Sequence, residues 1–291
     1  MYQHGWYQVA FEHELQEGLT PLCVGQQRLM AVKQQGTVRL FEATCPHRGA
    51  HLAHGGTLDG DTVICPFHGL CIHLGAAAGA ELAVRSYPCL VQGGMVFVRL
   101  SEKAEPDLPR ALTDIVRHST FIPGFTIQAN VSMEIAAENA LDNQHFKRVH
   151  GILNEPVFTV TTGPYGELCA EGDFVLPSMQ PTRPAHVKYR TGAFSPGVVI
   201  SELSGDPPYN YIIISTGTPT PEPNQCTIRL TLAMQRPVDE FFAKILLEAS
   251  QQGLEKDRAI WNNLAPQHVP QWTPRDLSAK AFAEFCYQFR H

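Results

Sequence analysis

Two short segments near the N-terminus each offer one thiol and one imidazole. The first is Cys45-Pro-His47 and the second, after a gap of 17 residues, is Cys65-Pro-Phe-His68. Two such loops can hold a two-iron cluster unevenly, with thiolates on one iron and neutral imidazoles on the other, which raises the reduction potential above that of an all-cysteine cluster. The alternatives to a 2Fe-2S cluster are a zinc site built from the same four side chains, or a coincidence of residues.

A second group of candidate ligands follows near the middle of the chain. Asp142 and His145 are three residues apart and therefore share one face of a helix. His150 lies about 140° away from His145 on a regular helix, so the helix must end or distort before both imidazoles can meet at one metal ion. Gly151 is a suitable helix stop. The alternative is a pair of buried or helix-capping histidines.

Two imidazoles need one carboxylate to complete the facial triad that binds Fe(II) and leaves positions open for other molecules. We expect a helix over residues 238–264 with a narrow inward-facing stripe that includes Asp257. The other members of the stripe are Phe242, Leu246, Ser250 and Gly253. A carboxylate on such a stripe is costly unless it is paired or bound to a metal. Asp257 is therefore the candidate third ligand, and an ion pair with Arg258 or Arg148 is the alternative.

Both groups of residues match the motifs of a known enzyme family. Cys45-Pro-His-Arg-Gly-Ala and Cys65-Pro-Phe-His-Gly resemble the paired boxes of the Rieske-type ring-hydroxylating and demethylating oxygenases. Residues 139–150 are similar to the N-x-x-D-x-x-H-x4-H signature of the same enzymes, and the segment from Asp257 resembles the one that supplies their third iron ligand. One departure is Leu70, which replaces the usual tryptophan and concerns packing rather than ligation.

The resemblance implies two metal cofactors and a role for each candidate residue. The 2Fe-2S cluster would be held by Cys45, His47, Cys65 and His68, and the mononuclear Fe(II) by His145, His150 and Asp257. Asp142 would bridge His145 of one subunit and His68 of its neighbour, so that electrons cross between the subunits of a head-to-tail homotrimer. Asn139 is either a hydrogen-bond donor near the iron or the cap at the start of a helix.

The resemblance also implies what the chain does. A ferredoxin- or flavin-type reductase that uses NAD(P)H would deliver electrons, and dioxygen would meet a small organic substrate at the iron. The first and last segments of the chain resemble the branch that includes vanillate demethylase, ketosteroid hydroxylases and cholesterol desaturases, which favours a monooxygenase that hydroxylates or demethylates an alicyclic or aromatic molecule. The alternatives are an electron-transfer or sensing protein with a non-catalytic second domain, and a desaturase that uses the same iron.

The patterning around these motifs predicts an α+β protein with two domains, residues 1–105 and 106–291. The first is expected to be all-β, because short strand-like runs alternate with turns. These runs cover residues 6–10, 28–32, 38–41, 62–64 and 95–100. Residues 101–110 are polar, contain two prolines and are interpreted as a linker.

The second domain is expected to combine a mostly antiparallel sheet with helices over one side, in the helix-grip (START-like) arrangement that the resemblance implies. Its predicted strands cover residues 125–135, 187–189, 198–203, 211–215 and 226–235, and its predicted helices cover 136–149 and 238–264. Residues 152–235 should supply much of the pocket. The aromatic candidates for its lining are Phe158, Tyr165, Tyr189 and Phe194; Trp261 is assigned to the core or the pocket wall.

The composition favours a globular chain that acts on small molecules. Its 291 residues are 44% hydrophobic and 17% charged, with a formal net charge of -6 and no long Lys/Arg run, which argues against nucleic acid or an anionic membrane as a partner. No stretch approaches the roughly 18 apolar residues of a membrane span, and the start does not read as a signal peptide, so we expect a cytoplasmic protein. The six cysteines outside the motifs are expected to be ordinary thiols.

Overall fold

The N-terminal part of the chain is built from short strands in three small sheets. The computed structural model describes residues 4–75, 81–101, 103, 105–177, 183–205, 209–265 and 268–290. One sheet has the order β1-β11-β10, formed by β1 (Trp6–Phe11), β11 (Met95–Arg99) and β10 (Cys89–Gln92). The second has the order β2-β3-β4-β9, formed by β2 (Gly18–Val24), β3 (Gln27–Gln34), β4 (Thr37–Glu42) and β9 (Ser86–Tyr87). The third has the order β5-β6-β7-β8, formed by β5 (Thr57–Asp59), β6 (Thr62–Ile64), β7 (Cys71–Leu74) and β8 (Ala83–Val84).

All five strands predicted in this part are present, as β1, β3, β4, β6 and β11. The prediction missed β2, β5, β7, β8, β9 and β10. Of these, β2 contains Pro21 in its middle. Proline cannot donate to a β-ladder, but β2 is an edge strand that pairs only with β3, so the residue is tolerated there. A single turn of 3-10 helix, η1 (Glu12–Glu14), links β1 to β2.

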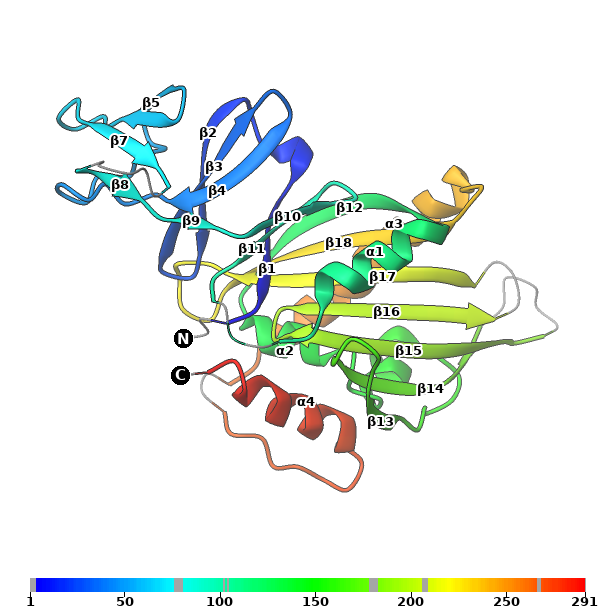
Figure 1. Ribbon diagram of the computed structural model, residues 1–291. Coiled ribbons are helices and arrows are strands. Elements are labelled where there is room, and N and C mark those ends of the chain that lie inside the picture. The colour runs from blue at the N-terminus through cyan, green and yellow to red at the C-terminus, as the bar shows by residue number, and fades with distance from the viewer. Residues whose placement is uncertain are drawn as a thin grey trace.

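The second part of the chain contains one seven-stranded sheet in which every neighbouring pair is antiparallel (Figure 1). Its strands, in spatial order, are β12 (Ser119–Ala129), β18 (Cys226–Gln235), β17 (Asn210–Pro219), β16 (Val198–Gly205), β15 (Ala185–Ser195), β14 (Leu168–Leu176) and β13 (Thr159–Thr162). The predicted antiparallel α+β class is therefore confirmed. The strand predicted over 125–135 is displaced, because β12 begins at Ser119 and Ser132 caps a helix instead.

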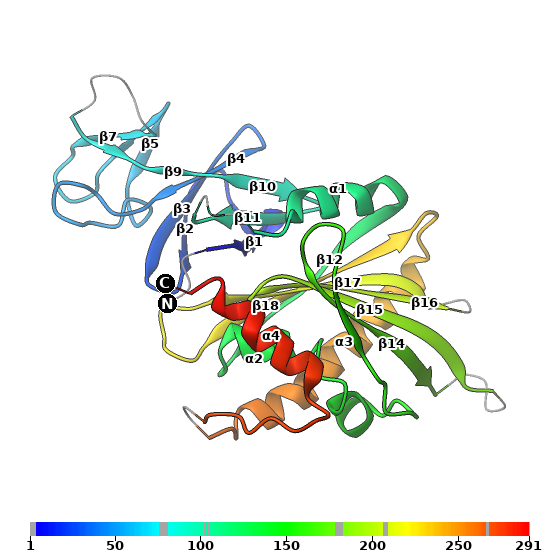
Figure 2. The ribbon, with the colours of Figure 1, turned by 60° about the horizontal axis from the view of Figure 1, so that its bottom comes forward.

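Helices cover both faces of this sheet rather than one. The faces can be told apart on β17, where Ile214 packs with α1 (Leu108–His118) and Ile213 packs on the side of α3 (Glu240–Trp261). Successive side chains of a strand point to opposite faces, so α1 and α3 lie on opposite sides of the sheet. The helix α4 (Leu277–Tyr287) lies on the α3 side, where Phe282 and Phe285 share a core with the sheet (Figure 2).

The helices differ from the predictions at three points. Residues 101–110 are not wholly a linker, because α1 begins at Leu108 with Asp107 as its cap and Pro109 in the first turn, where a missing N–H costs nothing. The single helix predicted over 136–149 is wrong: α2 (Met133–Glu138) ends early and is followed by a turn and a π-helix, η2 (Phe146–His150). The helix α4 was not predicted. The helix predicted over 238–264 is present as α3.

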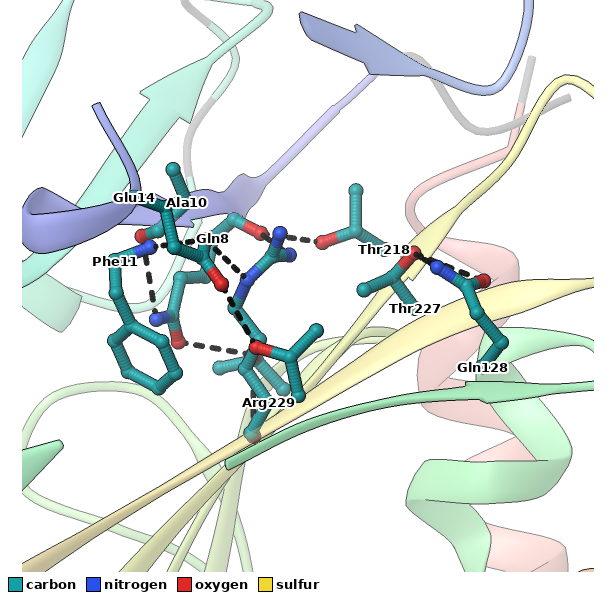
Figure 3. A network of polar contacts seen from close by, with 10 residues as sticks. Gln8, Ala10, Phe11, Glu14, Gln128, Thr218, Thr227 and Arg229 are labelled. Atoms are coloured by element: carbon teal, nitrogen blue, oxygen red, sulfur yellow. Dashed lines mark hydrogen bonds and ion pairs between the residues drawn. The ribbon is translucent and has the colours of Figure 1, made fainter. Parts of the chain in front are cut away.

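The two parts of the chain are joined by shared cores and by a polar network. Figure 3 shows this network at Gln8, whose backbone carbonyl accepts hydrogen bonds from Thr218 Oγ1 (2.7 Å) and Arg229 Nη1 (3.2 Å). Arg229 also lies 3.4 Å from the Glu14 carboxylate. A β-bulge in the β1–β11 pairing falls between Gln8 and Ala10, at the same place. The network fixes β1 against the large sheet.

Candidate functional site

The two Cys-His loops have the same backbone geometry. In the first loop, Cys45 N–H donates to the carbonyl of the residue five positions on (2.8 Å), and Gly49 N–H donates back to the Cys45 carbonyl (2.9 Å). In the second loop, Cys65 and Gly69 make the same two bonds at 2.8 and 2.9 Å. Both glycines have positive φ, 74° and 69°, so each tight turn uses a conformation that favours glycine. The loops therefore form a matched pair.

These loops bring the four candidate cluster ligands together. Cys45 and Cys65 are buried, whereas His47 and His68 are exposed with ring centroids 4.7 Å apart. Burial opposes ionisation of the Cys65 thiol, but hydrogen bonds from the Phe67 and His68 backbone and from Cys45 outweigh it and lower the pKa of Cys65. A thiolate held by N–H donors is the form that binds iron.

The spacing of the same four side chains separates a cluster from a single zinc ion. Ligands of one tetrahedral zinc lie roughly 3–4 Å from one another. Among the described residues, one group of three or more His, Cys, Asp or Glu side chains has all its ligand atoms within 4.8 Å of one another. This group consists of His145, His150 and Asp257. The Cys-His set does not form such a group, which argues against a single zinc ion bound by all four side chains.

The second group converges on a single point. His150 Nε2 lies 3.1 Å from His145 Nε2 and 3.4 Å from Asp257 Oδ2. Burial is the main cause of a lowered pKa at His145, with His150 acting in the same direction and Asp142 against it. The neutral imidazole is the form that ligates a metal, so donor type, protonation and spacing all fit Fe(II).

The π-helix is what allows His145 and His150 to meet. His145 is the residue just before η2 and His150 is its last residue, and a helix with i→i+5 hydrogen bonds returns residues five apart to nearly the same side. Gly151 ends it in the left-handed conformation at φ 73°, with its N–H bonded to the Phe146 carbonyl. The prediction that the helix distorts before His150 and stops at Gly151 is confirmed.

Asp257 reaches the same point from α3. Its side chain is 6% exposed, and Leu246, Ser250 and Gly253 of the predicted stripe line the same cavity. Among the described residues, Asp257 forms no ion pair with Arg258 or Arg148; its partner is His150, and Arg258 pairs with Glu255 at 2.6 Å. A buried carboxylate beside two imidazoles is costly without a cation between them.

Asp142 and Asn139 lie in the turn between α2 and η2. Asp142 is about one-third exposed; its Oδ1 accepts from Gln144 N–H (2.9 Å) and its Oδ2 lies 3.7 Å from His145 Nδ1. The helix-start cap is Ser132, whose hydroxyl accepts from Ile135 N–H, and not Asn139. Asn139 stands at the other end of α2 and lines the cavity.

A cavity of about 400 Å³ opens beside His145, His150 and Asp257. Its walls come from β14 to β18, α2, η2 and α3, and the additional lining side chains from the sheet are Phe174, Leu176, Tyr189, Ser201, Leu203, Tyr211, Ile213, Ser215 and Leu230. Burial raises the pKa of Tyr189 to about 12, so its hydroxyl stays protonated and donates to the Ala140 carbonyl (2.9 Å).

Of the four aromatic residues expected to line the pocket, only Tyr189 does so. Phe158 packs behind it with ring centroids 5.7 Å apart. Tyr165 and Phe194 line a separate hollow of about 450 Å³ near α1, on the opposite face of the sheet. Trp261 is in the core. The missed lining residues Tyr211, Ile213 and Ser215 alternate along β17, a signal that was present in the sequence.

The chain matches two families along nearly its whole length. Residues 5–90 match the family described as Rieske [2Fe-2S] domain, and residues 101–289 match the 3-ketosteroid 9alpha-hydroxylase C-terminal domain. Among the described residues, no helix has the length and apolar character that a membrane crossing requires.

Individual relatives agree with these families. Cholesterol 7-desaturase of Xenopus laevis is 25% identical over 99% of this chain and 72% of its own length. Cholesterol 7-desaturase of Bombyx mori is 30% identical over 51% of this chain, but that match spans only 36% of the silkworm enzyme.

Among solved structures, dicamba monooxygenase bound to 3,6-dichlorosalicylic acid superimposes with a TM-score of 0.77 at 18% identity, covering 99% of this chain and 97% of that one. NdmB of Pseudomonas putida CBB5 gives a TM-score of 0.73 at 18% identity, covering 98% and 90%. At such identities the likeness concerns the fold. The matched pair of Cys-His loops, the converging His-His-Asp group and the two family matches lead to one conclusion: the chain belongs to the Rieske non-haem iron oxygenases, as an oxygenase component with a Rieske [2Fe-2S] domain and a 3-ketosteroid 9alpha-hydroxylase-type catalytic domain.

Proposed function

We propose that this chain is a monooxygenase that hydroxylates, or O- or N-demethylates, a small alicyclic or aromatic molecule at an Fe(II) held by His145, His150 and Asp257. The observation that carries the proposal is the convergence of these three side chains at the wall of the 400 Å³ cavity. Two neutral imidazoles and one carboxylate bind Fe(II) on one face and leave room for other molecules.

The cluster would be held by Cys45, His47, Cys65 and His68. We place the boundary between the two domains after residue 105, because β10 and β11, which precede it, pair with β1. When bound, the cluster supplies single electrons and the ferrous ion activates dioxygen so that one oxygen atom enters a C–H bond of the substrate.

The walls of the cavity support a neutral, mostly apolar substrate. Apart from Asp257, the described cavity is lined by no Lys, Arg, Asp or Glu side chain. A charged substrate would lose its hydration there without gaining a partner, whereas an apolar one gains by leaving water. The hydroxyls of Ser215 and Ser250 are available to orient a single polar group of the substrate.

The chain's own residues prepare the site in three ways. His145 Nδ1 lies 2.7 Å from the Asp142 carbonyl, so this nitrogen donates its proton there and Nε2 is left as the free lone pair. The Asp257 charge offsets part of the charge of a divalent cation. The apolar wall around Leu203, Ile213 and Leu246 keeps water away from the place where oxygen is transferred.

We further propose a head-to-tail homotrimer in which electrons pass from one subunit's cluster to the next subunit's iron through Asp142. Two observations support this arrangement: His47 and His68 are exposed, and the sheet β5–β8 that flanks the cluster loops projects away from the α3 side of the molecule (Figures 1 and 2). An NAD(P)H-dependent reductase of the ferredoxin or flavin type would supply the electrons. The six cysteines outside the cluster loops form no disulfide, which suits the reducing cytoplasm.

The test is a count of metals on protein purified without oxygen. We expect about three iron and two labile sulfide per chain, with the electron paramagnetic resonance signal of a Rieske cluster after reduction. Asp257→Ala should fall to about two iron and keep the signal unchanged, because only the mononuclear site is affected. If the unaltered protein holds only about two iron even after incubation with ferrous ion, the oxygenase proposal is wrong and the chain is an electron carrier.

A desaturase is the second candidate, favoured by the 25% identity with cholesterol 7-desaturase over 99% of the chain. The same iron and the same cavity would serve both reactions. The two are separated by the mass of the product with a neutral alicyclic substrate, which gains one oxygen atom on hydroxylation and loses two hydrogen atoms on desaturation. A charged analogue of equal size serves as the control and should not react.

A further inference from the structure

The turn between α2 and η2, residues 139–145, carries Asn139, Asp142 and His145 and is held by side chains from outside the turn. Tyr189 hydroxyl donates to the Ala140 carbonyl (2.9 Å), and Ser278 hydroxyl donates to the Leu141 carbonyl (2.5 Å). Because this turn lacks the regular i→i−4 ladder of a helix, its shape depends on such donors and acceptors.

Two of these bonds come from the first turn of α4. Besides Ser278, which is 2% exposed, Asp276 contributes its Oδ1, which accepts from Gln144 Nε2 at 2.6 Å. Gln144 directly precedes His145. The other end of α4 is tied as well, since Nη2 of Arg290, just beyond α4, donates to both carboxylate oxygens of Glu134 of α2 (3.1 Å to each). The helix α4 thus connects both sides of the break in the α2–η2 segment, and Figure 2 shows it lying across α2.

Asp276 accepts a hydrogen bond from Gln144 instead of capping its own helix. Aspartate at a helix start normally accepts a hydrogen bond from the second or third N–H group of its own helix. Asp276 occupies this position in α4 but makes no such bond, because Oδ1 faces Gln144 and Oδ2 accepts from Thr273 N–H (2.6 Å). By contrast, Asp107 and Asp239 cap their own helices, α1 and α3.

We propose that Asp276 and Ser278 are positioning residues for His145, and that α4 thereby sets the affinity of the catalytic site for Fe(II). The inference rests on the proposed role of His145 as a ligand. The imidazole of His145 is oriented by its bond to the Asp142 carbonyl (2.7 Å), and that carbonyl lies between Leu141 and Gln144, which α4 holds. If the turn relaxes, the His145 imidazole rotates and its Nε2 moves away from His150 Nε2.

The experiment measures Fe(II) affinity directly, by competition with a chelator, on the cluster-loaded chain. We expect Asp276→Ala and Ser278→Ala each to raise the Fe(II) dissociation constant about tenfold, the low end of what groups behind a metal ligand contribute. Asp276→Asn keeps an acceptor for Gln144 and should lose less Fe(II) affinity than Asp276→Ala. The resonance signal of the reduced cluster should be unchanged in all three variants.

Matched controls separate positioning from a general loss of stability. Asp107→Ala removes a helix-start aspartate that caps its own helix, and Thr218→Val removes a buried hydroxyl bonded to a carbonyl at 2.7 Å on the other face of the sheet. Both should lower the melting temperature about as much as the test variants, with Fe(II) affinity within twofold of the unaltered chain.

The outcomes distinguish this inference from the proposed function. If the unaltered chain and His145→Ala bind Fe(II) equally poorly, the proposed function fails. If the unaltered chain binds Fe(II) and His145→Ala does not, while Asp276→Ala and Ser278→Ala behave like the controls, the inference about α4 is overturned and the proposed function stands.

Discussion

At the scale of single residues, the site works because neighbouring side chains fix one another's protonation and direction. His145 is kept neutral by its burial, with Nδ1 turned to the Asp142 carbonyl and Nε2 toward His150 and Asp257. Cys65 is drawn toward the thiolate by hydrogen bonds from its own loop. At each centre, the pKa of one candidate ligand is therefore shifted toward the form that binds a metal.

The cavity wall gives a prediction about substrate binding. Ile213 lines the cavity, and Ile212, its neighbour on β17, lines the hollow on the opposite face. Ile213→Trp should raise KM about tenfold or more, because a bulky ring removes space that an apolar substrate occupies. Steady-state kinetics with iron content measured alongside test this. Ile212→Trp is the control, and an equal effect of both variants would mean that the substrate does not occupy this cavity.

A second prediction concerns Glu138, which stands in α2 near other carboxylates. Burial, and after it the charges of Asp142, Glu134 and Asp276, raise the pKa of Glu138 to about 7. The unfolded chain binds this proton only below a pH of about 4.3. The folded state therefore binds more protons between the two values, and this contribution to stability is lost as pH rises toward 7.

Glu138→Gln should remove that dependence. The free energy of unfolding of the variant, measured by urea titration, should increase relative to that of the unaltered chain as pH rises from about 4.5 to about 7. The reason is that glutamine has no buried charge to form. Glu284→Gln, at an exposed position of α4, should follow the unaltered chain throughout. Parallel curves for Glu138→Gln and the unaltered chain would contradict the raised pKa.

At the scale of elements, one π-helix decides whether two histidines five residues apart can share a metal. A regular helix would separate His145 and His150, whereas η2 returns them to one side and Gly151 ends it at positive φ. Such a segment is less favourable locally than an α-helix and persists because its surroundings hold it. Here the surroundings include α3, where Gly253 leaves ordinary contact distance to the His150 ring (3.6 Å from a Cβ placed there).

Gly151→Ala tests the role of this helix end. The left-handed conformation costs an alanine about 1–2 kcal/mol, and no atom lies within 4 Å of a Cβ built there, so backbone strain is the whole effect. We expect that loss of stability together with weaker Fe(II) binding. Gly60→Ala, with φ 55° and equally open space, should lose similar stability and keep the iron. Melting temperature and iron content are the measurements.

At the scale of the whole molecule, the two domains behave as one packed body. Buried side chains of β1, β3, β4 and β11 form a continuous core with those of β12, α2 and β18. The polar network at Gln8 lies beside this core (Figure 3). In the proposed trimer, this packing fixes the direction in which the cluster loops face the next subunit.

Arg229 places a largely buried charge in this joint. Its side chain is 11% exposed and faces Glu14, which is 33% exposed. Arg229→Met should lower the free energy of unfolding by about 2 kcal/mol, less than a fully buried pair would lose because Glu14 retains some water. Arg258→Met, which breaks the exposed pair with Glu255, should cost under about 0.5 kcal/mol. Urea titrations that rank the two variants the other way would contradict a stabilising joint.

The sequence by itself determined most of the chemistry, because ligand type and short-range spacing are local. Cys45, His47, Cys65 and His68 stand in two loops whose Cys-Pro and Gly residues specify the turns. Local sequence also places Asp257 on the inward stripe of α3, through helical periodicity alone. It likewise requires a distortion of the helix between His145 and His150.

The tertiary structure alone decided what depends on distant partners. The helix α4 packs on a core formed by the sheet and holds the turn at residues 139–145, and neither contact leaves a periodic signal near those residues. Tyr165 was assigned to the wrong hollow because it lies in the turn between β13 and β14, which reaches α1, where its hydroxyl donates to the Asp114 carboxylate (2.9 Å). Phe194 lies five residues after Tyr189 on β15 and therefore points to the opposite face of the sheet. Local sequence specifies donors and turns, whereas pairing across the sheet decides which of them meet.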